Sequence, residues 1–272
     1  WYYPKKIFNF SHLKPIPMRL FQKYSLLFLL TAFMATAQQN TEPPESSTTA
    51  AVPELVLIYS KTEGYRHQSI EKGVLTLKQL GRANGFIVLQ TETASDINPE
   101  NLKNYKLVVF LSTTQDVLND TQQLAFERYI KNGGSFLGIH AAADTEYEWS
   151  WYGKLVGGYF ESHPNNPNVR KASIQRIDKT HASSSHLPDT WVRNDEWYNY
   201  KNLNPAMNVV LNLDESTYEG GTNGENHPIA WYHEFDGGRA YYTGGGHTEE
   251  SFDEPEFRQH LLGAIEWCLK RD

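Results

Sequence analysis

Four continuous apolar runs in the first half of the chain have the length of β-strands. They cover residues 55–60, 86–91, 107–113 and 135–139. The runs at 55–60 and 135–139 have the pattern of strands that are covered on both faces. We therefore predict four strands, of which these two are buried.

Helical patterns separate these apolar runs. Residues 69–85 carry apolar side chains at helical spacing and end at Gly85, a common stop signal. A second pattern fills residues 121–132, where Asp120 can cap the first turn and a double glycine follows the last. Strands that alternate with helices in this way predict an α/β fold with a doubly wound, mainly parallel sheet.

The second half of the chain has a different pattern. Aromatic side chains crowd residues 147–160, and a last helix is predicted over residues 255–270, with Pro255 in its first turn. Between them, further strands are predicted at residues 169–177, 195–200, 208–213, 228–235 and 239–243. The expected architecture is a parallel α/β core that carries an inserted aromatic-rich segment.

The beginning of the chain has the pattern of an export signal. Met18 is the first methionine, basic residues follow it, and an apolar run over residues 26–34 precedes Ala35-Thr36-Ala37, a small-residue cleavage site. We expect residues 1–17 to be a non-native upstream extension and residues 18–37 to be a signal peptide. An uncleaved membrane anchor is the alternative. The apolar run is shorter than the roughly 20 residues that cross a bilayer, so we expect no stable anchor.

The remaining chain divides into a linker and a domain. Residues 38–53 are polar and rich in Pro, Ser and Thr, which is typical of a disordered linker, and residues 54–272 have the length of one domain. The net charge of −7 argues against a nucleic-acid partner. Because Cys268 is the only cysteine, this periplasmic or secreted domain has to be stabilised by its core rather than by a disulfide.

Three histidines follow predicted strands. His67 lies in the loop after the first strand, His140 directly after the fourth, and His247 after the strand at residues 239–243. In open α/β sheets, ligands bind beyond the carboxyl ends of the strands, so we expect the three side chains to converge on one cleft. Neutral imidazoles there can bind a divalent metal such as zinc, or act as general acid and base without a metal.

Each histidine also has a purely structural interpretation. His67 can cap the helix that begins near Ser69. His140 can be a core histidine with satisfied hydrogen bonds, although a residue held in a functional turn is expected to contribute little core burial. The three glycines before His247 form either a strained turn or a close approach to a ligand. Glu196 and Trp197 can likewise be ordinary alternating strand residues.

Six separated segments, taken together, resemble a known family. They are "SKTEGYRHQSI", "GIHAAADT", "LVGGYFESHP", "NDEWYNY", "HPIAWYHEFDGGRAYYTGGGHTEESF" and "FRQHLLGAIEW". In this order they are similar to the ThuA-like domain, named for a trehalose-utilisation protein, from about residue 54 to residue 270. The resemblance implies the flavodoxin-like fold of the class I glutamine amidotransferases, in which a cysteine occupies the position of His140 and a histidine lies near that of His247.

The resemblance also implies a link to carbohydrate utilisation. Because imidazole cannot form the thioester that glutamine hydrolysis needs, no amidotransferase activity is expected. We predict an exported enzyme that acts on a glycoside or an oxidised (keto) sugar, with a small-molecule carbohydrate as its partner. A non-catalytic carbohydrate-binding module on the same fold is the alternative, and homo-oligomerisation stays open.

The candidate site residues divide by role. The catalytic group consists of His140, His247 and Glu196, with Asp195 as an alternative to Glu196. The metal ligands would be His67, His140 and His247, and either Glu196 or Asp195 is a fourth ligand or a second acid/base group. The substrate-binding group consists of His67, Asp144, Trp151, His163 and Trp197. Aromatic residues such as Trp151 more often belong to a core, but an exposed tryptophan suits stacking on a sugar ring.

Overall fold

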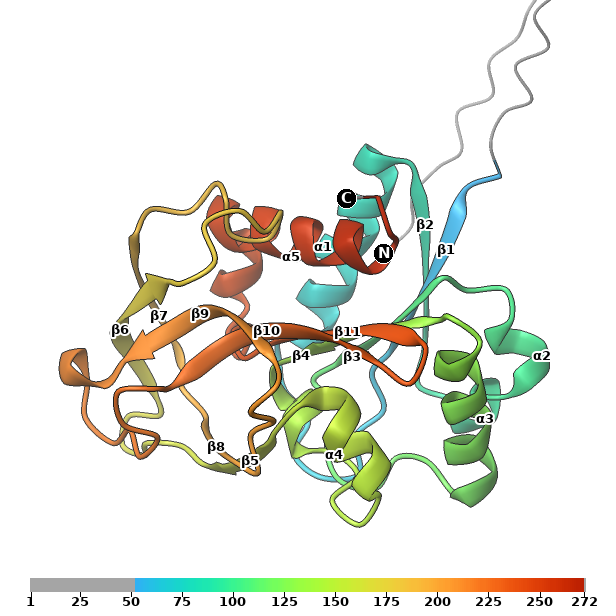
Figure 1. Cartoon of the computed structure of the whole chain (residues 1–272), viewed down its shortest axis with the longest axis horizontal. Helices are drawn as coiled ribbons and strands as arrows, with labels where there is room; N and C mark the ends of the chain where they lie inside the picture. The colour runs from blue at the N-terminus through green and yellow to red at the C-terminus, as the bar shows by residue number, and fades with distance from the viewer. Residues whose placement is uncertain (1–51, 272) are drawn as a thin grey trace, which may run out of the picture. The chain divides into compact units, whose positions relative to one another are not determined.

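The computed structural model describes residues 52–271; the predicted upstream extension, signal peptide and most of the linker lie outside the described residues. The fold is mixed α/β around one large sheet (Figure 1). The helices are α1 (Ile70–Asn84), α2 (Pro99–Leu102), α3 (Asp120–Lys131), α4 (Ser150–Val156) and α5 (Pro255–Cys268). Within the described residues, no helix has both the length and the apolar character needed to cross a membrane.

Nine strands form the large sheet, and two short strands pair separately. The large sheet contains β1 (Glu54–Tyr59), β2 (Phe86–Thr91), β3 (Leu107–Leu111), β4 (Ser135–Ile139), β6 (Val169–Arg176), β7 (Thr190–Glu196), β9 (Asn208–Asp214), β10 (Pro228–Phe235) and β11 (Gly238–Thr243). The separate pair is β5 (Tyr159–Ser162) and β8 (Asn199–Lys201).

The sheet has a parallel part and an antiparallel part. In the order β2-β1-β3-β4-β11, all neighbours are parallel. From β11 through β10, β9, β6 and β7, all neighbours are antiparallel. β4 and β11 pair although Ser135 and Arg239 are about 100 residues apart in sequence. The carboxyl ends of β1, β3, β4 and β11 therefore share one edge of the sheet.

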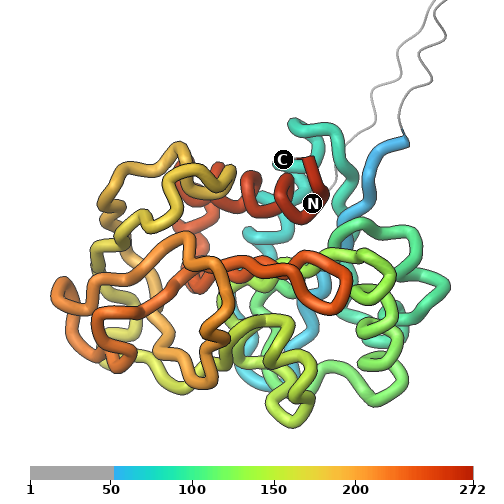
Figure 2. The backbone as a smooth tube through the Cα atoms, viewed as in Figure 1, coloured from blue at the N-terminus to red at the C-terminus, as the bar shows by residue number. Residues whose placement is uncertain are grey.

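Helices cover both faces of the parallel part. Figure 1 shows α1 and α5 on one face and α3 and α4 on the other. In Figure 2 the dark red trace of α5 runs beside α1, and residues of the two helices are in contact. The central strands β3 and β4 are buried along their whole length, as their continuous apolar runs predict. The flavodoxin-like assignment and the separate aromatic-rich insertion stay predictions.

Some predicted boundaries were wrong. Asn119, not Asp120, caps α3: its side chain accepts from the Gln122 amide, and the Gln122 side chain bonds back to the Asn119 amide. The strand predicted over 195–200 is divided between β7 and β8, which belong to different sheets. A local pattern could not show this division, because a strand that changes sheet keeps its apolar alternation.

A buried histidine outside the candidate site makes stability depend on pH. His260 on α5 is fully buried, with Nδ1 2.8 Å from the Ser183 carbonyl oxygen and Nε2 3.1 Å from the Thr243 hydroxyl. Burial lowers its pKa to about 3, whereas an unfolded histidine titrates near pH 6.5. Below that pH the unfolded chain binds a proton that the folded chain does not, so stability falls as the pH falls from about 6.5 toward 3.

We therefore expect His260 alone to lower the free energy of unfolding by about 2 kcal/mol between pH 7 and pH 5. Urea unfolding of the wild type and of His260→Gln at both pH values measures this effect. The variant should be less stable at pH 7 but should lose about 2 kcal/mol less on acidification. An equal loss in both proteins would assign the acid sensitivity to other groups.

Candidate functional site

His140 follows β4 directly and has an uncommon backbone conformation. Its φ is +51°, in the left-handed region that His, Asn and Asp tolerate better than most non-glycine residues. The Tyr242 hydroxyl donates to the His140 carbonyl oxygen at 2.8 Å, and the His140 ring is fully buried. The expectation that this residue contributes little core burial was therefore wrong, because neighbouring loops cover the turn.

A hydrogen bond at Nδ1 of His140 fixes the tautomer of the ring. Nδ1 lies 2.9 Å from the carbonyl oxygen of Gly244. Because a carbonyl oxygen only accepts, Nδ1 carries a proton. In the neutral ring, Nε2 then presents a lone pair.

Three other side chains converge on His140 Nε2. His67 Nε2 lies 3.2 Å away, His247 Nδ1 lies 3.3 Å away and Glu196 Oε2 lies 3.3 Å away. The last two atoms are 3.0 Å from each other, and all four lie within 4.8 Å of one another. We call His67, His140, Glu196 and His247 the histidine–glutamate cluster. Its members come from the loop after β1, the turn after β4, the end of β7 and the loop after β11.

The spacing of the histidine–glutamate cluster fits a metal ion. Bonds of about 2.1 Å place neighbouring ligand atoms about 3.0 Å apart in an octahedron and about 3.4 Å apart in a tetrahedron. The triangle of His140, Glu196 and His247 has edges of 3.0, 3.3 and 3.3 Å. In the neutral His140 ring, a lone pair faces a carboxylate oxygen, and two such acceptors repel unless a cation or a proton lies between them. The donor set therefore fits a divalent ion or a shared proton.

The pKa values of the residues in the histidine–glutamate cluster are shifted from their ordinary values. Burial and the neighbouring His140 and His247 lower the pKa of His67 to about 2. Burial raises the pKa of Glu196, but the hydrogen bonds and positive charge that His140 and His247 supply when protonated outweigh it and hold the pKa well below its usual range. Burial lowers the pKa of His247, but the hydrogen bond and charge of Glu196 outweigh it and raise the pKa. Glu196 is thus an anion and His67 a neutral ring, the states in which each residue binds metals, whereas the raised pKa of His247 favours the protonated ring of the shared-proton alternative.

Asp195, the sequence alternative to Glu196, lies behind the histidine–glutamate cluster. Its carboxylate accepts the backbone N–H groups of Gly246 at 2.8 Å, His247 at 3.0 Å and Glu196 at 3.0 Å. It also accepts the Ser251 hydroxyl at 3.0 Å. Successive residues of a strand point to opposite faces, so only one of Asp195 and Glu196 can reach the ring of His140. Asp195 holds the backbone of two cluster residues instead.

The three glycines before His247 allow this close approach. Gly246 has a φ of +109°, a conformation that favours glycine. A Cβ on Gly245 would lie 2.6 Å from Nη1 of Arg193, the guanidinium nitrogen that pairs with Asp195 at 3.1 Å. The turn interpretation holds, because Gly246 has a left-handed backbone conformation; close approach of these glycines to a ligand stays a prediction.

Several polar side chains lie around the histidine–glutamate cluster. Asn168 Nδ2 donates to Glu196 Oε1 at 2.7 Å and lies 3.2 Å from His247 Nε2. His163 is partly exposed, with Nδ1 3.6 Å from Glu196 Oε1. Asp144 is half-buried and accepts the Tyr147 hydroxyl at 2.6 Å. Burial raises the pKa of Asp144. The neighbouring His140 and His163 lower this pKa, and Glu196 raises it.

The two predicted tryptophans differ in position. The Trp197 ring is fully buried, and its Nε1 donates to the Arg170 carbonyl at 2.7 Å, so it packs in the core. Trp151 stacks on Trp149 and donates to Asp236 at 2.9 Å. Asp236 precedes β11, at the opposite edge of the sheet from the cluster. Burial covers the Trp197 ring, and the contact with Asp236 places Trp151 at the far edge of the sheet.

Sequence reasoning did not single out two residues beside the histidine–glutamate cluster. Asn168 precedes β6 in a polar loop, where an asparagine carries no distinguishing signal. Tyr198 is buried against the His140 ring, with centroids 4.4 Å apart; its position two residues after Glu196 in "NDEWYNY" was the one available hint.

Comparison with known proteins identifies the family. The ThuA family, described as trehalose utilisation, matches residues 55–268. The chain belongs to the ThuA family. None of the curated proteins matches the chain.

Solved structures agree with this membership. A putative ThuA-like protein from Bacteroides uniformis shares 26% identity over 84% of this chain and 96% of its own, with a TM-score of 0.70. A putative ThuA-like protein from Parabacteroides merdae shares 18% identity over 81% of this chain and 91% of its own, with a TM-score of 0.65. A β-galactosidase from Bacillus circulans shares the fold over 31% of its length, at 13% identity over 79% of this chain and a TM-score of 0.52.

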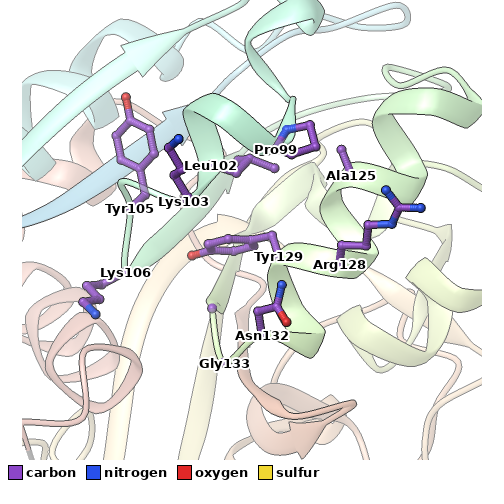
Figure 3. A pocket seen from close by; sticks show the side chains of 11 residues that line it. Pro99, Leu102, Lys103, Tyr105, Lys106, Ala125, Arg128, Tyr129, Asn132 and Gly133 are labelled. Carbon is purple, nitrogen blue, oxygen red and sulfur yellow. The ribbon is translucent and has the colours of Figure 1, made fainter.

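A separate hollow lies at the opposite edge of the sheet in this ThuA protein. Figure 3 shows its lining, with the ring of Tyr129 between the segments that lead into β3 and β4. Its volume is about 250 Å³. Its cationic residues include Lys103, which pairs with Glu100 on the exposed surface. The cationic residues of this hollow are ordinary surface side chains. We therefore place the candidate site at the histidine–glutamate cluster and not in the hollow.

Proposed function

We propose that this ThuA protein is an exported enzyme of carbohydrate utilisation that acts on a glycoside or an oxidised (keto) sugar at the histidine–glutamate cluster. The observation that carries the proposal is the convergence of four potential ligand atoms, from four separate chain segments, within 4.8 Å. Buried polar groups this close are costly unless a cation or a proton satisfies them. Family membership supports a carbohydrate as the substrate.

We propose a divalent metal, such as zinc, as the cofactor. His67 Nε2, His140 Nε2, His247 Nδ1 and Glu196 Oε2 would hold it. Such an ion supplies Lewis-acid polarisation of a substrate oxygen. The hydrogen bond of His140 to Gly244 is the outer contact that orients a histidine ligand, and Asn168 orients the carboxylate of Glu196 in the same way.

The remaining chemistry belongs to side chains of this chain. His163 is partly exposed beside Glu196, where it can exchange a proton with a bound sugar. Asp144, with its raised pKa, can hold a proton at a higher pH than an ordinary aspartate. Acid–base catalysis by the histidines without a metal is the alternative mechanism at the same site.

Glutamine amidotransferase activity does not fit this site. Histidine stands where the thiol of the amidotransferases would be. Cys268 is buried on α5, where its Sγ contacts the Phe136 carbonyl oxygen at 3.5 Å, and burial raises the pKa of the thiol. A buried thiol with a raised pKa is a poor nucleophile.

Metal analysis of the purified protein tests the proposal. We expect about one divalent ion per chain, and turnover of glycosides or keto sugars that a chelator abolishes and zinc restores. Turnover that withstands complete metal removal would assign the reaction to acid–base catalysis. Sugar binding with no turnover, in metal-loaded protein, would make the chain a binding module and contradict the enzymatic proposal.

We also propose that the fold is flavodoxin-like, which the order β2-β1-β3-β4-β11 supports. Export is proposed from the sequence pattern of residues 18–37. N-terminal sequencing of the exported protein should begin near Gln38. A mature protein that retains residues 26–34 would contradict export by signal cleavage.

A further inference from the structure

We propose that Tyr65, Gln115 and Asp144 form a subsite for a neutral pyranose ring beside the histidine–glutamate cluster. The inference rests on the proposed function, because it names where the sugar of that reaction binds. Its starting observation is Tyr65, a residue that is 63% exposed. The ring of Tyr65 lies edge-on to the buried ring of His67, with centroids 4.9 Å apart. An exposed aromatic ring thus lies next to the candidate reaction centre.

The loop that carries Tyr65 is held in place. The Thr114 hydroxyl donates to the Tyr65 carbonyl oxygen at 3.1 Å, and the Gly64 amide lies 3.1 Å from the same hydroxyl oxygen. The Glu63 amide donates to the Thr114 carbonyl oxygen at 3.0 Å. The loop after β1 is therefore fixed to the end of β3. A platform fixed before binding loses little conformational entropy when it stacks on a ligand.

Polar groups continue from Tyr65 along the same edge. Gln115 follows Thr114, is exposed, and lies so close to Gly64 that a Cβ there would be 2.8 Å from its Cγ. Its amide nitrogen is 3.5 Å from Asp144 Oδ1, and its backbone N–H donates to the Asp144 carbonyl oxygen at 2.8 Å. An apolar ring, an amide and a carboxyl group are thus aligned on the carboxyl ends of β1, β3 and β4.

This combination matches the chemistry of a sugar ring. A pyranose has an apolar face of C–H groups, which packs on an aromatic ring, and hydroxyl groups at its edge that both donate and accept. The amide of Gln115 offers a donor and an acceptor, and the carboxylate of Asp144 offers acceptors. A ring stacked on Tyr65 with hydroxyls toward Gln115 and Asp144 would lie beside His67.

The charges of this edge favour a neutral sugar over a phosphorylated one. Arg66, the cation next to Tyr65, already pairs with Glu71 at 2.7 Å and with Glu92 at 2.9 Å. The subsite itself contributes the carboxyl of Asp144, which repels an anion when it is ionised. We therefore expect a neutral glycoside to bind better than its phosphate ester.

Calorimetric titration of the full exported protein with trehalose, maltose and cellobiose tests the subsite. We expect Tyr65→Ala to weaken binding of the preferred sugar about tenfold, and Tyr65→Phe, which keeps the ring, to bind within about twofold of the wild type. Asparagine tolerates the φ of +63° at position 115. Its shorter side chain moves the amide back from the sugar, so Gln115→Asn should also weaken binding. Leu124→Ala on α3, an exposed apolar control away from the subsite, should not.

The outcomes separate this inference from the proposed function. Equal affinity in the wild type and Tyr65→Ala, or no binding of any of these sugars by the wild type, would overturn the subsite. Tighter binding of glucose 6-phosphate than of methyl glucoside would overturn the preference for neutral sugars. Loss of binding in Tyr65→Ala from a wild type that binds but does not turn over sugar would support the subsite while contradicting the enzymatic proposal.

Discussion

Replacing His140 by asparagine is expected to abolish metal binding and to reduce sugar turnover by at least about a hundredfold. Nε2 of His140 is the atom that the other three cluster atoms approach at 3.2 to 3.3 Å. Asparagine tolerates the φ of +51°, so backbone strain is kept small, but its shorter side chain cannot reach the same point. Metal content, turnover and melting temperature should be measured on the same preparations.

Two further variants sharpen this prediction. His140→Ala leaves a cavity in a fully buried position, so we expect it to destabilise the fold by about 2–4 kcal/mol as well as to abolish turnover. His140→Cys supplies the residue of the amidotransferase relatives, and we expect no hydrolysis of glutamine and no sugar turnover. Substantial sugar turnover in His140→Cys would show that imidazole is not required and would remove the catalytic role of His140.

Replacing Asp195 by asparagine is expected to weaken metal affinity about 10- to 100-fold without changing any metal ligand. The carboxylate of Asp195 accepts the backbone N–H groups of Glu196, Gly246 and His247. An amide group offers one acceptor oxygen in place of two, so its NH₂ would face at least one of these donors. The backbone of Glu196 or His247 must then shift, and the cluster loses its spacing.

Glu254→Gln is the matched control for Asp195→Asn. Glu254 accepts from the other side of the same arginine, Arg193, at 2.8 Å, but it belongs to the segment between η4 (Glu250–Asp253) and α5. We expect Glu254→Gln to keep metal affinity and turnover near the wild-type values. Similar losses of affinity in both variants would show that Arg193, rather than the positioning of Glu196 and His247, explains the effect. Metal competition titrations at fixed pH distinguish the two results.

The sequence determined the central strands and the places of the three histidines. Continuous apolar runs identify β1, β3 and β4 because buried parallel strands have no polar face. The ends of such strands meet at one edge, so His67, His140 and His247 could be expected to lie together before any atom was placed. Six motifs in the right order indicated the ThuA family, which the match over residues 55–268 shows.

Only the tertiary structure decided which atoms face one another. β7 places Glu196 toward His140 and Asp195 behind it, but the alternation of a strand shows only that the two differ, not which one faces the site. Asn168 reaches the cluster because β6 pairs with β7. The sequence of the polar loop that contains Asn168 does not indicate this pairing. The sequence of the aromatic segment suggested Trp151 as a ring on which a sugar could stack. Its contact with Asp236 instead places it at the far edge of the sheet.

The division follows from the range of the forces involved. Hydrophobic periodicity and turn residues act within a few positions of the chain, so the sequence alone determines strands, helices and the ends at which functional residues appear. The cluster depends on β11 pairing with β4 across about 100 residues and on Asp195 binding the backbone of the loop after β11. Such long-range pairing is fixed by the packing of the whole domain, and only the folded chain brings His67, His140, Glu196 and His247 within coordination distance.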